Sequence, residues 1–305
     1  MDFRDLKYFE AIAEEGHLGR AAEKLFRTQP ALTKCIDRLE DELGAKLFER
    51  AGRGLRLTPL GEVLLARTRQ MALMMDDTVR EIGDHAKGVE GHIRLGCVPT
   101  LAEHLLPQVC QELLAEAPKV TIDLKVGMND ALLEGLRAGE LDLVLGPVVQ
   151  NDAAIVSEEI MRDKMVVMAS ARHAIFSRPV TLETLLEYDW VLPARSVASR
   201  QWLDNVFDQH GLSGPRVQIC PTVLNMILPM IEQTGLLGFA SELNLRMGRS
   251  QLKEVPFDLT TMNRRMGMAY RSDAYLPPAT QRLVNLLRRK AAGMNEDGRI
   301  DGETA

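Results

Sequence analysis

Apolar residues in the first part of the chain recur every three or four positions, which is the spacing of helices that keep one face on a core. This spacing predicts a helix that ends near Gly16, a second helix over Leu18 to Phe26, and a third that ends at Gly44. Thr28 suits the N-cap of the third helix, where it can accept a hydrogen bond from the first turn. Pro30 suits that first turn because its missing N–H costs nothing there.

The third helix has an apolar face and a polar face. The apolar positions follow the helical spacing: Leu32, Cys35, Ile36, Leu39 and Leu43. The polar face carries side chains that can pair with base edges or phosphates: Gln29, Thr33, Lys34 and Arg38. Two short helices joined by a tight polar turn, with donors at the start of the second, are typical of a helix-turn-helix. The alternative is an ordinary helical hairpin whose polar side only faces water.

A small β-hairpin is expected next. Lys46 to Phe48 and Leu55 to Leu57 are short extended segments, and the glycines at 52 and 54 suit a tight turn between them. Three helices followed by this hairpin make a winged helix-turn-helix. Arg50, Arg53 and Arg56 gather in the hairpin, and Arg53 between its two glycines is well shaped to enter a minor groove. A solvated turn is the alternative.

Thr58 and Pro59 repeat the cap-and-proline signal and open a long helix that runs to about Lys87. Its inward positions alternate spacings of three and four: Leu65, Thr68, Ala72, Met75, Val79 and Ile82. A helix this long on a small head favours pairing with its copy in a second chain, which would place two heads on two half-sites. Packing against its own domain is the alternative.

After a hinge at residues 88–91, strands alternate with helices, which predicts βαβ units on parallel sheets. Strands are expected at 92–98, 120–126, 141–145, 164–169, 190–192, 216–220, 235–239 and 265–270. Helices are expected at 100–116 with an early break at Pro107, and at 130–138, 182–187, 199–209, 223–232 and 279–290. A chain segment that forms one sheet, forms a second sheet and then returns to the first is typical of a two-lobed module with a cleft. Residues 293–305 are polar and are expected to be disordered.

The ends of these strands predict where the module binds a ligand, because ligands of open α/β sheets lie at the carboxyl ends of strands, near helix N-termini. The polar side chains expected there are Thr100, Asn129, Arg195, Ser196, Ser199 and Asn225. Arg195 or Arg200 could hold a carboxylate. For each of these residues, a helix cap or a surface position is the alternative.

Composition narrows the class of protein. With 46% hydrophobic and 26% charged residues, the 305-residue chain has an ordinary globular composition and is long enough for two or three domains. The net charge is −6, and the first sixty residues carry eleven basic and eleven acidic side chains, so charge alone does not indicate a nucleic-acid partner. The start carries acids, so we expect no signal peptide, and no stretch is long enough to span a membrane.

The sequence lacks the common motifs of catalysis and metal binding. It contains no P-loop, no GxSxG, no HExxH and no GxGxxG after a strand, and its six histidines are scattered. The cysteines at 35, 97, 110 and 220 are far apart, so we expect reduced core thiols and no metal site. An enzyme is not favoured, and no cofactor is expected other than a small organic effector.

Five stretches of the N-terminal part resemble LysR-type transcriptional regulators: Leu18 to Leu25, Thr28 to Thr33, Leu39 to Gly44, Leu47 to Arg50 and Leu57 to Gly61. Ala138 to Leu143 is similar to part of the family's effector domain. The resemblance implies an α+β, multidomain chain with an N-terminal winged helix-turn-helix (1–58), a linker and dimerisation helix (59–87) and a hinge (88–91). A two-lobed α/β effector domain of the type II periplasmic-binding-protein kind (92–292) and the tail (293–305) would follow.

The resemblance also implies site residues. By matching position, the residues that would face the major groove are Thr28, Gln29, Pro30, Thr33 and Lys34, and Arg53 would enter the minor groove. Arg38 and Arg50 complete the expected DNA contacts. Lys34 stands where the family more usually has arginine, which exchanges a bidentate fork for a point charge. Asn129 stands where the family often has serine or threonine, so the identity of the effector does not transfer.

The sequence therefore predicts a cytoplasmic LysR-type regulator that binds double-stranded promoter DNA as a homodimer or homotetramer. A small, anionic effector in the C-terminal cleft would modulate that binding. RNA polymerase is a further candidate partner, and no membrane partner is expected. The runner-up is a solute-binding protein, since two-lobed α/β modules also serve transport. The N-terminal head and the lack of a signal peptide oppose that alternative.

Overall fold

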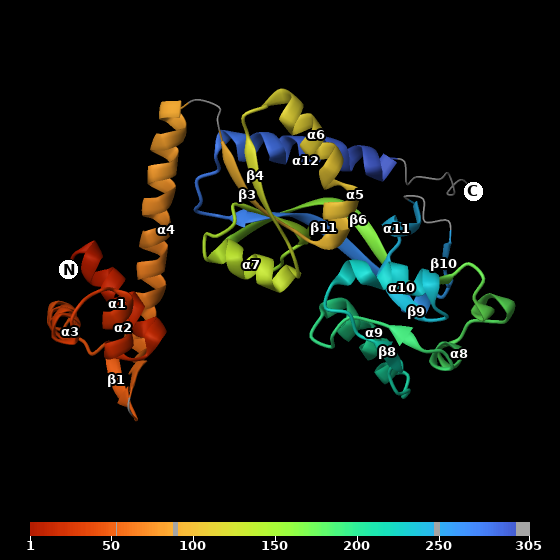
Figure 1. The fold of residues 1–305 in the computed structure, drawn as a ribbon, viewed down its shortest axis with the longest axis horizontal. Helices are drawn as coiled ribbons and strands as arrows, with labels where there is room; N and C mark the ends of the chain where they lie inside the picture. The colour runs from red at the N-terminus through yellow and green to blue at the C-terminus, as the bar shows by residue number, and fades with distance from the viewer. Residues whose placement is uncertain (53, 88–90, 247–250, 297–305) are drawn as a thin grey trace. The chain divides into compact units, whose positions relative to one another are not determined.

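The structure is a computed structural model that describes residues 1–52, 54–87, 91–246 and 251–296 (Figure 1). The chain forms two compact units, Met1–Gly83 and Asp84–Ala305, which we call the head and the C-terminal unit. Arg53 and the expected hinge residues 88–90 lie outside the described residues, as does the tail from 297 onward.

The head contains the three helices and the hairpin expected from the sequence, followed by the long helix. These are α1 (Phe3–Glu15), α2 (Leu18–Lys24), α3 (Gln29–Leu43), β1 (Phe48–Ala51), β2 (Gly54–Leu57) and α4 (Pro59–Lys87). Several expected boundaries were wrong: α2 ends at Lys24, the first strand spans Phe48–Ala51, and the second begins at Gly54. The first strand lies later than expected because backbone pairing sets its position, with Phe48 opposite Leu57 and Ala51 opposite Gly54.

Local signals mark the helix ends of the head. Asp2 caps α1 by accepting a hydrogen bond from the Asp5 backbone. α1 and α3 stop at Gly16 and Gly44, both in the left-handed conformation that glycine adopts without strain. Thr28 occupies the N-cap of α3 as expected, but its side chain makes no capping hydrogen bond, so that part of the prediction was wrong.

The core of the head forms where α1, α2 and α3 meet the hairpin. Its largest buried side chains include Phe9, Ile12, Leu32 and Leu39, and the stripe of α3 faces inward as expected. Leu43 was expected to complete that stripe but is 44% exposed, because it is the last residue of the helix and lies beyond the core.

α4 packs on the head through its first turns only. Leu64 and Leu65 pack against the head's core, and Thr68 is buried. Farther along the helix, the expected inward residues Val79 and Ile82 are 70% and 65% exposed. The helix therefore packs on its own unit over one part and leaves an apolar row uncovered on the rest.

The first lobe of the C-terminal unit begins with parallel strands and their helices. Its elements are β3 (His92–Cys97), α5 (Pro99–His104), α6 (Leu106–Glu116), β4 (Thr121–Val126), α7 (Asn129–Arg137) and β5 (Leu143–Pro147). The expected helix break before Pro107 is present, because α5 ends at His104 and α6 begins at Leu106. β3 pairs in parallel with both β4 and β5, so the three strands end on the same edge.

The second lobe follows the long strand β6 (Ile155–Ser170). It contains η1 (Ala174–Ser177), α8 (Leu182–Leu186), β7 (Trp190–Val191), α9 (Ala198–Gln209), β8 (Val217–Ile219), η2 (Leu224–Met226), α10 (Ile227–Gln233), β9 (Leu237–Ser241), α11 (Leu243–Arg246), β10 (Leu252–Glu254) and η3 (Asp258–Thr260). β11 (Met262–Arg271) and α12 (Pro278–Glu296) return the chain to the first lobe. α12 continues to Glu296, past the expected helix end at residue 290.

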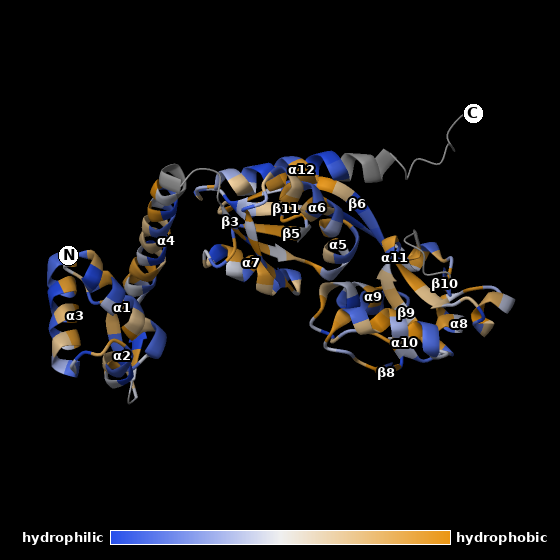
Figure 2. Cartoon of the chain, turned by 45° about the horizontal axis from the view of Figure 1, so that its top comes forward, coloured by the Kyte–Doolittle hydropathy of each residue, from blue (hydrophilic) through white to orange (hydrophobic). Residues whose placement is uncertain are grey.

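One hydrogen-bonded sheet joins the two lobes, instead of the two parallel sheets expected. Its strand order is β4-β3-β5-β11-β6-β9-β7-β8, with β10 paired to β6. β6 and β11 run antiparallel to each other from one lobe into the other, so the expected strand at 164–169 is only the last part of β6. α6 and α12 cover one face of the first lobe's sheet and α7 covers the other (Figure 1). The strands between them are largely hydrophobic, as sheets buried on both faces require (Figure 2).

Candidate functional site

The start of α3 presents a polar edge to solvent. The residues of this edge, which we call the α3 edge, are all exposed: Thr28, Gln29, Pro30, Thr33 and Lys34. Lys34 makes no ion pair within the described residues, so its charge is available to an outside partner. The opposite face of the same helix holds Leu32 and Leu39 in the core. The helix is therefore fixed by one face and free on the other.

Arg38, one turn farther along α3, is partly engaged within the head. Its guanidinium donates to the buried carboxylate of Asp5 on α1, and this hydrogen bond raises the pKa of Arg38. The thiol of Cys35 lies against the same carboxylate, and burial followed by the charge of Asp5 raises its pKa to about 12. The Arg38 side chain stays exposed, so its remaining N–H groups can reach outward.

A buried carboxylate ties the hairpin to α3. Glu40 accepts hydrogen bonds from the backbone N–H of Leu47 at 2.8 Å and of Phe48 at 3.4 Å, and from Lys46 Nζ at 2.5 Å. Burial by itself raises the pKa of the Glu40 carboxyl, but the hydrogen bonds from Lys46, Leu47 and Phe48 outweigh it and hold the pKa below its usual value. The α3 edge and the hairpin therefore keep one relative position within the head.

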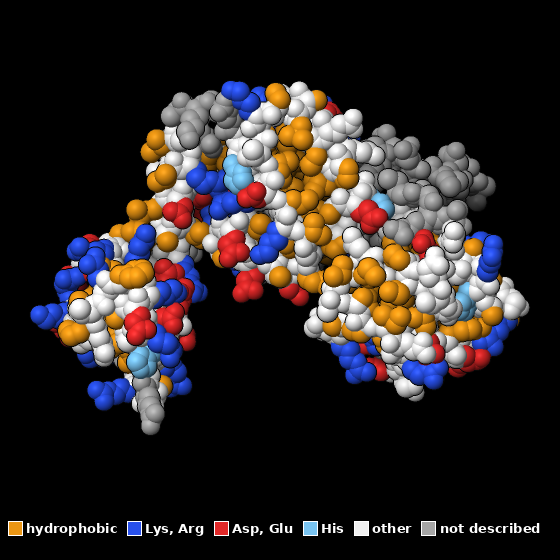
Figure 3. All heavy atoms as spheres, in the orientation of Figure 1, with side chains coloured by type: hydrophobic (Ala, Val, Ile, Leu, Met, Phe, Trp, Pro, Cys, Tyr) orange, Lys and Arg blue, Asp and Glu red, His pale blue; other side chains and the backbone are white. Residues whose placement is uncertain are grey.

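The hairpin carries the second set of expected contacts. Arg50 on β1 is exposed, and Arg56 on β2 pairs with Glu49 across the strands at 2.5 Å. Gly52 at the tip has φ 58°, which glycine adopts without strain. Basic and acidic side chains are intermixed on the face of the head that Figure 3 shows, so net charge alone does not single out the candidate contacts.

In the first lobe, two of the expected ligand residues come to one edge of the sheet. Val98 donates its N–H to Leu145 and Gly127 donates to Cys97, which ties the ends of β3, β4 and β5 together. Thr100 and Asn129 follow directly in the first turns of α5 and α7.

The amide oxygen of Asn129 is buried and has no hydrogen-bond partner within the described residues. It lies 2.6 Å from the point that a Cβ on Gly146 would occupy. Any side chain at position 146 would therefore displace this amide. An unsatisfied buried acceptor costs free energy, which a hydrogen-bond donor that reached this oxygen would recover.

In the second lobe, the expected residues follow β7 and β8, whose ends are joined by a hydrogen bond from Leu192 to Ile219 at 3.1 Å. Arg195 and Ser196 are exposed in the loop after β7, Ser199 is in the first turn of α9, and Asn225 is exposed in η2. Arg200, the other expected carboxylate ligand, is buried, and its Nε is bonded to both oxygens of Asp204 at 2.8 Å.

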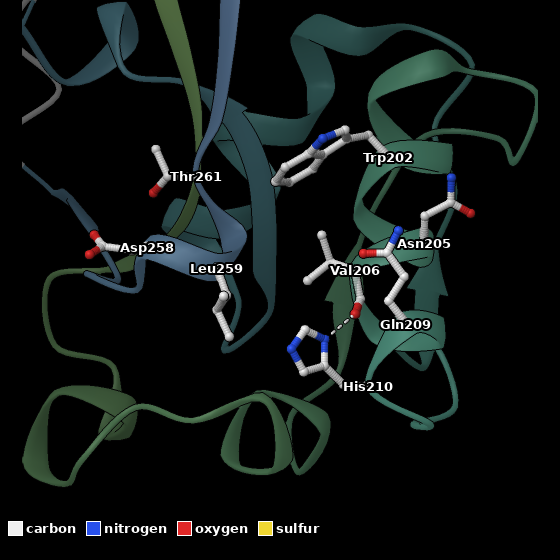
Figure 4. Close-up of a pocket in the computed structure, with 8 residues that line it drawn as sticks. All are labelled: Trp202, Asn205, Val206, Gln209, His210, Asp258, Leu259 and Thr261. Carbon is white, nitrogen blue, oxygen red and sulfur yellow. Dashed lines mark hydrogen bonds between the residues drawn. The ribbon is translucent and has the colours of Figure 1, made fainter.

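A surface hollow of about 360 Å³ lies elsewhere on the second lobe, between α9 and η3 (Figure 4). Trp202, Val206 and Leu259 line it together with polar side chains such as Asp258, and the His210 ring is held by a bond to the Val206 carbonyl at 2.8 Å. None of the six expected ligand residues lines it. The hollow therefore lies apart from the strand ends where the ligand residues were expected.

Sequence patterns missed the two carboxylates that organise the head. Asp5 and Glu40 are buried, yet both occupy helix positions where an acid usually faces water. The faint signal for Glu40 was its position one residue after Leu39, on the edge of the apolar stripe. The cysteines were also predicted too simply, since Cys35 and Cys97 are buried but Cys220 is exposed.

Two other kinds of site are absent from the described residues. No helix there is long and apolar enough to cross a membrane. In the same part of the chain, His, Cys, Asp and Glu side chains form no group of three or more that could hold a metal ion.

Comparison with known proteins matches both parts of the chain. The family described as "Bacterial regulatory helix-turn-helix protein, lysR family" matches residues 3–62, and the family described as "LysR substrate binding domain" matches residues 86–292. The regulator PcaQ of Agrobacterium fabrum is 28% identical over 305 residues, which cover 98% of each chain. The regulator YofA of Bacillus velezensis is 30% identical over 297 residues, which cover 94% of this chain and 98% of that one.

Solved structures of whole regulators have the same fold. Full-length CbnR in complex with its target DNA has a TM-score of 0.60 at 22% identity, covering 95% of this chain and 100% of that one. A full-length BenM mutant has a TM-score of 0.55 at 25% identity, covering 100% of this chain and 99% of that one.

Proposed function

The chain belongs to the LysR family of bacterial helix-turn-helix regulators, and we propose that paired heads bind promoter DNA under the control of a small molecule held in the C-terminal unit. The chain is thus a DNA-binding transcriptional regulator with an effector-binding domain. LysR-family proteins are regulators and not enzymes in general, and we extend that assignment to this chain. We also place its action in the cytoplasm, where bacterial promoters lie.

The observation that carries the DNA proposal is the exposed α3 edge on a helix whose other face is in the core. We propose that Gln29 and Thr33 reach base edges in the major groove and that Lys34 takes a guanine or a phosphate. Thr28 and Pro30 would lie against the groove wall. Arg38, Arg50 and Arg53 would contact the phosphates or the minor groove, Arg38 through the N–H groups that Asp5 does not use.

We propose that the uncovered row on α4 joins two chains. Met75, Val79 and Ile82 are exposed at spacings of four and three, as in a helix that packs against a copy of itself. Pairing covers this row and holds two heads together, so that the second head binds at the high effective concentration that a short tether gives. Dimers would pair further into tetramers, and RNA polymerase is a candidate partner of the bound assembly.

We propose that the effector binds at the strand ends of the two lobes. Thr100 and Asn129 contribute from the first lobe, and the unsatisfied Asn129 oxygen takes a donor group of the effector. From the second lobe, Arg195 holds an anionic group, and the neighbouring polar side chains complete the site: Ser196, Ser199 and Asn225. The effector can change the affinity of the protein for DNA only if it binds one arrangement of the two lobes more tightly than the other.

A gel-shift experiment tests the DNA proposal. Genomic fragments are mixed with the full chain at low ionic strength, and the retained fragments are sequenced. We expect retention of a limited set that share an interrupted palindrome, and a steep loss of retention as salt is added. A chain that retains no duplex at low ionic strength contradicts the proposal.

A thermal-shift screen tests the effector proposal separately. A ligand at 100 times its dissociation constant adds about 2.7 kcal/mol to the stability of the form it binds. We expect one or a few carboxylate metabolites to raise the melting temperature of the wild-type chain and to raise that of Asn129→Ala less. Equal shifts in the two proteins would place the ligand away from Asn129.

A further inference from the structure

The turn between α2 and α3 contains a bulky residue in the left-handed region of backbone conformation. Among the described residues, the non-glycine residues with positive φ are Asn151 at 59° and Phe26 at 52°. Asparagine tolerates this conformation, whereas the Cβ of a phenylalanine crowds the following carbonyl. Phe26 therefore lies in a conformation that its own side chain disfavours.

The hydrogen bonds around Phe26 show why the backbone takes this form. The N–H of Phe26 donates to the Glu23 carbonyl at 3.1 Å, and the N–H of Arg27 donates to the Ala22 carbonyl at 2.9 Å. These two bonds make the common helix-ending motif in which glycine usually holds the left-handed position. α1 and α3 of the same head end at glycines in that conformation, Gly16 and Gly44. Local structure at residue 26 thus calls for glycine or asparagine.

Among the described residues, burial of the ring does not offset this strain. Phe26 is 93% exposed, whereas its neighbour Leu25 packs against the core of the head. An exposed ring gains no burial energy, although burial is the main reason for placing an aromatic residue in a fold. Strain that the rest of the fold does not repair is characteristic of residues that act on something outside it.

The position of Phe26 indicates what lies outside. It comes two residues before Thr28 and three before Gln29, at the beginning of the α3 edge. Arg27 beside it donates to the Tyr8 hydroxyl at 2.9 Å, which fastens the turn to α1. These bonds therefore fix the backbone of Phe26 close, along the chain, to the proposed DNA-reading residues.

We infer that Phe26 is a further DNA contact, in which its ring packs against apolar carbon atoms of the duplex next to the base pair that Gln29 reaches. Thymine methyl groups and deoxyribose carbons both offer such atoms. This inference rests on the proposed DNA-binding function of the α3 edge. It predicts that replacing Phe26 by asparagine raises the stability of the head but weakens DNA binding. Asparagine suits the left-handed backbone, whereas phenylalanine supplies the apolar ring that would contact the duplex.

The experiment uses the full chain and duplexes that the wild-type chain selects from a random-sequence pool. Affinity for one selected duplex is measured for the wild type, Phe26→Ala and Phe26→Asn, and for Leu43→Ala as a control with an exposed apolar residue at the other end of α3. We expect both Phe26 variants to bind roughly tenfold more weakly, a factor that corresponds to about 1.4 kcal/mol. Leu43→Ala should bind like the wild type, and Phe26→Asn should melt at a higher temperature than the wild type because asparagine relieves the strain.

Replacing single thymines of the duplex by uracil distinguishes the two sources of apolar atoms. If the ring contacts a methyl group, one replacement weakens the wild type but not Phe26→Asn. If the ring contacts deoxyribose, no single uracil replacement weakens binding by the wild type, and both Phe26 variants still bind more weakly than the wild type. Equal binding by the wild type and both variants would overturn the inference and leave the proposed function standing. A wild-type chain that selects no duplex at all would overturn both.

Discussion

Removal of the Glu40 carboxylate tests whether the hairpin is held to α3 in the way the structure indicates. In Glu40→Ala, the backbone N–H groups of Leu47 and Phe48 lose their acceptor. Leu47 is buried, so its N–H cannot turn to water without opening the hairpin. Hydrogen bonds to a charged group contribute about 1.5–3 kcal/mol each, and the bond to Phe48 is long, so we expect a loss of roughly 3 kcal/mol. Lys46 is exposed and adds little.

Calorimetry of the full chain measures this loss. A domain of 60–100 residues loses roughly 4–8 °C of melting temperature per kcal/mol, so the transition of the head should fall by more than about 10 °C. Asp41→Ala is the matched control, because Asp41 is an exposed acid on the same helix. Removing a negative charge near the C-terminal end of a helix should leave stability unchanged or slightly raised.

The pH dependence of the stability of the head tests the role of Glu40 independently. Because the pKa of Glu40 is lower in the folded head than in the unfolded chain, its stabilisation is fully present above the unfolded pKa of about 4.3 and is lost as pH falls through the folded value. The difference in stability between the wild type and Glu40→Gln should therefore be constant from pH 7 to about pH 5 and should shrink below that. A difference that does not change with pH, or a loss in Glu40→Ala below about 0.5 kcal/mol, would refute this account of the hairpin.

Three further predictions test other parts of the molecule. Gln29→Ala should weaken binding to a selected duplex by about 1–3 kcal/mol and relax the preference at one base pair, as measured by competition with single-base variants; unchanged affinity and preference would show that Gln29 does not face the groove. Val79→Glu with Ile82→Glu should convert dimers to monomers in analytical ultracentrifugation while Asp76→Asn does not, because only the first pair places charges in the proposed interface. Gly61→Ala should destabilise the head, because its Cβ would lie 2.2 Å from the Leu47 carbonyl oxygen. A Cβ on Gly83 would meet no atom within 4 Å, so Gly83→Ala should stabilise α4 by about 1 kcal/mol. Similar melting temperatures for the two variants would contradict this packing.

The α3 edge shows how much of a functional surface a sequence can determine. The spacing of Leu32, Cys35, Ile36 and Leu39 sets which face of the helix is buried, and so it also sets that Gln29, Thr33 and Lys34 are exposed. Caps and breaks are equally local, because a glycine or proline acts on the backbone within one turn. Most helix positions and the exposed residues of α3 therefore follow from the amino-acid sequence alone, whereas α11, β10 and the first part of β6 were not predicted.

The pairing of distant segments could not be predicted in the same way. That β6 extends to Ile155 and joins both lobes in one sheet depends on its register with β11, some hundred residues later. That Glu40 serves as an acceptor for the hairpin, and that Phe26 finds no cover, depends on which atoms of other segments come near. The sequence by itself determined most of the helices, their buried faces and the exposed residues of α3, because these follow from spacing within a few turns. Only the tertiary structure decided which polar groups are satisfied, which are left strained or unpaired, and how the lobes share their strands, because those depend on contacts between residues far apart in the chain.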